Sequence, residues 1–175
     1  MKTDSTHVLK ILHVVFWVLF IGFCIQIGSV LISFLVSKFS NPAGAQNLSM
    51  GLNLLSLKSY SEAHYAGVVS LIVYFLVVKA YMAYLVIQIF RRLDFAVPFS
   101  AEVAALITQI SHVALGAGVV GLGAARYSKW LMKSGAVEAL TWPGGEFLLL
   151  AGIIFLIARV FQKGADIQAE NALTV

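Results

Sequence analysis

The stretch Ile11–Ser37, ILHVVFWVLFIGFCIQIGSVLISFLVS, decides the fold of this chain. It holds no Asp, Glu, Lys or Arg and is bounded by Lys10 and Lys38. A helix that crosses the hydrocarbon core of a bilayer needs about 20 apolar residues, because each residue advances it by about 1.5 Å. The stretch is too long for the apolar region of a signal peptide, and no small-residue cleavage site follows it. We interpret it as an uncleaved first membrane helix.

The composition also points to the membrane. Of the 175 residues, 60% are hydrophobic and only 11% are charged, with a mean hydropathy of +0.91. A soluble domain carries about 25% charged residues, so this chain has too little polar surface to cover a water-soluble globule. The net charge of +4 comes from Lys and Arg beside apolar runs, which indicates lipid headgroups rather than nucleic acid. Cys24, the only cysteine, lies deep in the first run, where we expect a small core residue.

Three further segments approach the length of a membrane span. The second is uncharged except for Lys79, the third is uncharged, and the fourth is short and contains Arg159. If the fourth segment spans, Arg159 must place its guanidinium in the headgroups; a re-entrant or surface helix is the alternative. The sequence predicts an all-α fold, an antiparallel bundle of four transmembrane helices forming one domain over residues 1–175. The predicted helices cover about 8–37, 63–91, 101–126 and 145–168.

The connections carry the remaining fold signals. The first connection contains LSMGLNLLSLKSYS, residues 48–61, which is apolar enough to lie on the membrane surface or to pack against the bundle. In the second, Ser100 followed by Glu102 is a helix-start signal. Basic residues are divided almost equally between the two sides. The pair Arg91–Arg92 in the tight second loop favours cytoplasmic termini.

Two ionisable residues fall inside predicted spans. A charged side chain there costs about 2.5–3.5 kcal/mol on insertion scales, so Lys79 is a functional candidate; the alternative is a lysine near the inner edge whose amine reaches the headgroups. Counting from the tight loop places His112 at a similar depth. We predict a candidate polar site in the membrane at Lys79 and His112. A neutral histidine bonded to a neighbouring hydroxyl or carbonyl is the simpler alternative.

Motifs for chemistry are lacking. No nucleophile–base pair is visible, and the GLGAAR run lacks the setting of a dinucleotide site. His7, His13 and His64 do not match His112 in depth, which argues against a haem held by two histidines. The sequence predicts a protein that is not an enzyme, with no catalytic residue, cofactor or metal.

Small residues recur on the third predicted helix. Ala117, Gly121 and Ala125 are spaced by four and share a face. In lipid, such rows let helix backbones pack closely. We predict that this row packs against another helix, in the bundle or in an oligomer; a cofactor groove is the alternative.

Two short motifs resemble a known family. The tail Gly164–Val175, GADIQAENALTV, and the loop Pro98–Glu102, PFSAE, are similar to those of a bacterial family of small four-helix inner-membrane proteins of unknown function. Chains of that family end in Gln-x-Glu-Asn-x-Leu-Thr-Val. Val103 departs from the family pattern, which has asparagine there. The resemblance implies a bacterial inner (cytoplasmic) membrane location and a small helix-turn-helix regulator encoded nearby, and it supplies no activity.

The tail itself is polar on one side. The candidate partner-docking residues are Asp166, Gln168, Glu170 and Asn171. The alternative is a frayed, solvated helix end.

These observations predict a non-enzymatic membrane protein, a regulatory partner or accessory subunit of a larger complex. The alternative is a small oligomeric transporter or channel-like protein with a polar path near Lys79 and His112. The lack of a carboxylate in any helix interior argues against a proton-coupled pump. Expected partners are membrane lipid and either another protein, a membrane subunit or a cytoplasmic regulator, or further copies of the chain, without direct contact to nucleic acid.

Overall fold

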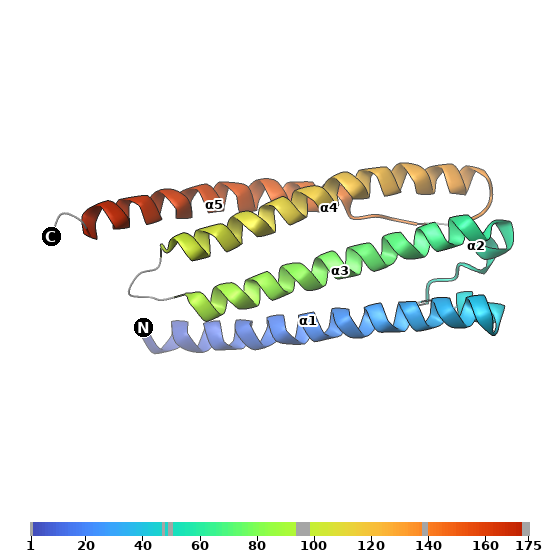
Figure 1. Cartoon of the computed structure of the whole chain (residues 1–175), viewed down its shortest axis with the longest axis horizontal. Helices are drawn as coiled ribbons and strands as arrows, with labels where there is room; N and C mark the ends of the chain where they lie inside the picture. Colours follow the sequence, from blue (N-terminus) through green and yellow to red (C-terminus); the bar gives the residue numbers. More distant parts are fainter. Residues whose placement is uncertain (1, 47, 49–50, 94–98, 138–139, 173–175) are drawn as a thin grey trace.

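Four long helices build an antiparallel bundle (Figure 1). The computed structural model describes residues 2–46, 48, 51–93, 99–137 and 140–172. The long helices are α1 (Lys2–Phe39), α3 (Glu62–Arg92), α4 (Ala101–Lys133) and α5 (Gly144–Ala172). All four are long and apolar enough to cross a membrane, and the described residues contain no strand. The predicted all-α, multi-pass fold is confirmed.

The helices pack in chain order. α4 and α5 make the most extensive pair, and α3 lies between α1 and α4. Among the described residues, the backbones of α1 and α5 do not approach each other. α1 begins and α5 ends at the same end of the bundle (Figure 1). The bundle is therefore open along one side, between its first and last helices.

The helices run past the predicted ranges. α4 continues to Lys133 rather than ending near residue 126, and α5 is one continuous helix of 29 residues. Lys and Arg are good helix formers, so the charges that end an apolar run do not end the helix. The predicted start of α4 is confirmed. The hydroxyl of Ser100 accepts a hydrogen bond from the backbone nitrogen of Val103 at 3.2 Å, and Arg92 pairs with Glu102 at 3.2 Å.

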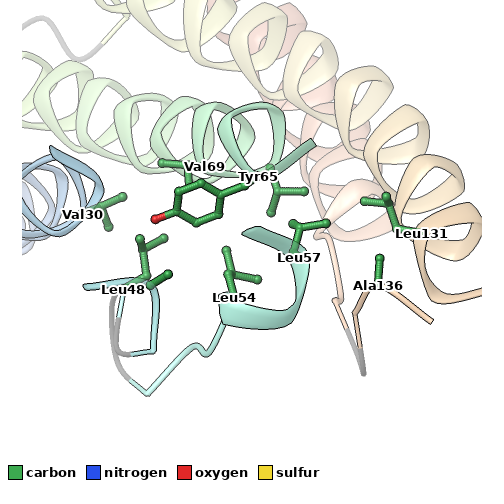
Figure 2. Close-up of a cluster of buried hydrophobic side chains, with 10 residues drawn as sticks. Val30, Leu48, Leu54, Leu57, Tyr65, Val69, Leu131 and Ala136 are labelled. Carbon is green, nitrogen blue, oxygen red and sulfur yellow. The ribbon is translucent and has the colours of Figure 1, made fainter. Parts of the chain in front are cut away.

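The end away from the termini is closed by a hydrophobic cap, which we define as η1 (Pro42–Ala45), α2 (Leu55–Tyr60) and the parts of α1, α3 and α4 that they cover. Figure 2 shows buried side chains converging there. The labelled members are Val30, Leu48, Leu54, Leu57, Tyr65, Val69, Leu131 and Ala136. The described part of the first connection thus packs against the bundle, the second of the two predicted alternatives.

Polar contacts fasten α1 to the cap. The buried Ser37 hydroxyl donates to the Tyr65 hydroxyl at 2.9 Å, and the Lys58 amine donates to the Ser37 carbonyl.

Nearer the other end of α1, the expectation for Cys24 is wrong: this side chain is exposed rather than part of the core. The reason is that, within the described residues, α3 is the only long helix on which α1 packs, so most of the α1 surface away from the cap faces outward.

Candidate functional site

The middle of the membrane can be located on α4. Its uncharged run is bounded by Glu102 and Arg126, and Ala114 lies halfway between them. The Gln109 amide donates to the Tyr81 hydroxyl at 2.6 Å, which aligns α4 with α3. Lys79 is two residues from Tyr81, and His112 is three residues from Gln109 in the matching direction. Both ionisable side chains therefore lie within about one helical turn of the midplane.

Lys79 lines a groove of about 360 Å³ between α1 and α5. The side chain is exposed, and every other lining residue is apolar. The walls are Phe16, Leu19 and Phe23 of α1 and Phe147, Leu150 and Ile154 of α5, and the floor adds Met82, Ala83, Val86 and Ile110. We call this the Lys79 groove. Within the described part of the chain, the amine has no hydrogen bond or ion pair.

The depth of Lys79 separates its two predicted readings. By its alignment with α4, Lys79 lies about three residues, or about 5 Å, from the midplane on the side of Arg92, so about 10 Å of hydrocarbon separates it from the nearer edge of the core. The half-thickness of the hydrocarbon core is about 15 Å. A four-carbon stem covers little more than one turn of about 5.4 Å, so the amine stays inside the hydrocarbon. This geometry favours a lysine that needs a partner over one that reaches the headgroups.

His112 lines a different and smaller groove, of about 100 Å³, between α4 and α5. Its neighbours form a chain of hydrogen bonds from α5 to α4. Arg159 donates to Gln162 at 3.2 Å, and Gln162 donates to the Thr108 hydroxyl at 3.1 Å. The Arg159 guanidinium also lies 5.0 Å from the ring centroid of Phe155. His112 itself is exposed and, among the described residues, has no hydrogen-bond partner.

The structure does not bring Lys79 and His112 into one site. They share a depth, but no residue lines both of their grooves. Sequence reasoning missed Thr108 and Gln162. The available signal was spacing, since Thr108 and His112 are four apart on α4 and Arg159 and Gln162 are three apart on α5, so each pair shares a helix face.

The packing row lies at the α4–α5 contact. Ala117 and Gly121 are buried, and Ala125 is half-buried. A Cβ atom on Gly121 would lie 2.6 Å from the Cα of Gly144, so the two backbones touch there. One turn along, a Cβ on Gly118 would meet the side chain of Leu148, also at 2.6 Å.

The candidate docking tail is the last part of α5, which stays helical to Ala172. Asp166 and Glu170 are exposed, and Gln168 is half-buried. Asn171 belongs to the helix, and residues 173–175 of the tail lie outside the described residues.

Comparison with protein-family models, with curated proteins and with solved structures finds no match to this chain. Within the described residues, no group of three or more His, Cys, Asp and Glu side chains is placed to hold a metal ion. Lys79 and His112, the two side chains near the midplane, are therefore the features that bear most directly on function.

Proposed function

We propose that this protein is a non-enzymatic subunit of a larger membrane complex, an accessory or regulatory component of the bacterial inner membrane with both termini in the cytoplasm. One observation carries the proposal. Lys79 and His112 are both exposed near the midplane, on two different faces, and neither has a partner among the described residues.

In a lipid environment, polar side chains without a partner are evidence for a contact with another molecule. Exposed apolar surface needs no explanation in hydrocarbon, whereas a polar group without a hydrogen bond costs several kcal/mol there. Ionisable residues within spans accordingly pair with one another, with carbonyls or with water-filled cavities. A helix of a second protein supplies the missing partners without a change in this fold.

The outward surface of α4, with the adjoining edges of α3 and α5, offers the broader contact. We call it the α4 polar stripe, and its members are Tyr81, Thr108, Gln109, His112, Arg159 and Gln162. His112 lies one turn from Gln109, which bonds to α3, and one turn from Thr108, which bonds to α5. Hydrogen bonds between helices are one source of association in membranes, beside close packing. The stripe thus supports lateral assembly with another membrane helix.

The end of α5 offers a second, aqueous contact for a cytoplasmic regulator. The helix continues for nine residues past Lys163, or about 14 Å, and exposes Asp166 and Glu170. Charge reversal of both residues should release a cytoplasmic partner and leave the membrane partner bound.

The test is affinity purification from native membranes through an N-terminal tag. We expect a stoichiometric second membrane protein with the natural chain, and its loss with His112→Leu. Leu122→Met is the matched control, because Leu122 is exposed on α4 about 15 Å along the helix from His112 and the change keeps it apolar. Recovery of the chain without any stoichiometric partner would contradict the proposal.

A further inference from the structure

We propose that the Lys79 groove docks a transmembrane helix of a different protein, one that carries an Asp or Glu near the midplane and pairs its carboxylate with the Lys79 amine. This inference rests on the proposed function, because it assigns the chemistry of one partner to one face of the subunit.

The groove is open to such a helix from the side. Its walls belong to α1 and α5, whose backbones do not approach each other among the described residues. Lys79 on the floor is exposed between them. A helix laid along this opening can insert side chains between Leu19 and Leu150 and reach the amine.

Charge complementarity identifies the side chain that must be present. An ammonium surrounded by apolar side chains has lost its hydration, and a carboxylate is the partner that restores most of its electrostatic stabilisation at low dielectric. The groove offers no other polar group, so recognition depends on this one pair.

The depth favours a spanning helix over a lipid anion. Phosphates and carboxylates of lipids lie in the headgroups, about 15 Å from the midplane. Moving one to Lys79 would remove it from water. In contrast, a residue in a spanning helix is held at its depth by the segments on both sides.

The sequence favours a different protein over a second copy. Its eight acidic residues are Asp4, Glu62, Asp94, Glu102, Glu138, Glu146, Asp166 and Glu170. None lies inside the uncharged run of a span. Glu146 comes closest, four residues before Leu150, but it lies outside the uncharged run, in the first turn of α5. In the described structure no ion pair joins it to Lys79.

The experiment combines site-specific cross-linking with charge exchange in the full chain in native membranes. A photoreactive residue at Leu19 or Leu150 should capture one membrane protein, and the same residue at Ile25, exposed on α1 outside the groove lining, should not.

Lys79→Met should reduce co-purification of that protein by at least about tenfold, since a difference of about 1.4 kcal/mol corresponds to a factor of ten. Lys79→Arg should retain it. Lys79→Glu should be rescued by changing the acidic residue of the captured helix to Lys. Val77→Met, at an exposed position of α3, is the matched control.

Four results would overturn the inference. They are a captured helix without a midplane carboxylate, capture of lipid alone, capture of a second copy, and loss of the partner with Glu146→Gln. If a partner is lost with His112→Leu but kept with Lys79→Met, the proposed function stands and this inference fails. If no partner is found at all, the proposed function fails as well.

Discussion

Gly121 of α4 and Gly144 of α5 lie so close that neither position has room for a methyl group. A Cβ atom on Gly121 would come within 2.6 Å of the Cα of Gly144, and a Cβ on Gly144 would come within 2.7 Å of the backbone nitrogen of Leu122. Backbone atoms cannot yield as a flexible side chain can. The contact therefore determines how closely the start of α5 approaches α4.

Substituting this glycine should loosen the helix pair. We expect Gly121→Ala to lower the free energy of unfolding by about 1–3 kcal/mol, the usual cost of inserting atoms into a packed contact, and Gly121→Leu to lower it further. The measurement is thermal unfolding of the detergent-purified protein. Gly116→Ala is the control, because nothing lies within 4 Å of a Cβ there. Equal melting temperatures for the two alanine variants would remove the packing argument.

Removing the amine at the midplane should not destabilise the isolated chain. Lys79 has no hydrogen-bond partner among the described residues, so Lys79→Leu strands no other group. We expect the melting temperature of the purified protein, free of any partner, to stay the same or to rise, because a charged residue in a span costs about 2.5–3.5 kcal/mol. A clear decrease would show that the amine is bonded within the chain.

A buried hydroxyl in the cap should contribute measurably to stability. Tyr65→Phe removes the acceptor of the Ser37 hydroxyl and leaves that buried group unpaired. We expect a loss of about 1–3 kcal/mol in the free energy of unfolding. Tyr74→Phe should be neutral, because Tyr74 is exposed and, among the described residues, its hydroxyl has no hydrogen bond. Similar losses in both variants would mean that removing any tyrosine hydroxyl lowers the stability, and that the bond to Ser37 is not the cause.

The two ends of the chain should label from the same side of the membrane. α1 begins and α5 ends at one end of the bundle. Single cysteines at positions 5 and 172, introduced with Cys24→Ser, should react alike with an impermeant maleimide before and after the cells are permeabilised. Opposite labelling of the two positions would mean that an odd number of helices spans the membrane.

Counting residues along the sequence predicted the depth of side chains in the membrane well, and the direction in which they point poorly. The four spans follow from runs of apolar residues, and the start of α4 follows from the local chemistry of Ser100, so both could be predicted from the sequence. The depth shared by Lys79 and His112 is also a matter of counting. Which way each side chain points depends on the rotation of its helix, and that rotation follows from contacts such as Gly121 against Gly144, between residues far apart in sequence.

Longer-range contacts explain the remaining differences. The cap unites Leu48, Tyr65 and Leu131 from three separate parts of the chain, and no local pattern indicates that they meet. Cys24 was expected in the core because its neighbours are apolar, but in a membrane protein apolar surroundings do not distinguish the interior from the lipid-facing side.

The attachment of α1 has a mechanical consequence. Its only buried side chains among those described are Val30 and Ser37, both at the cap, while its opposite half makes ring contacts with α3 such as Phe20 with Tyr84. Segments with few buried contacts are the ones that move at the lowest free-energy cost. We therefore expect the cap to be the firmest attachment of α1. A tilt of α1 about this attachment would displace its far end most, so we expect a helix that docks beside Lys79 to widen the opening by moving α1 rather than the rest of the bundle.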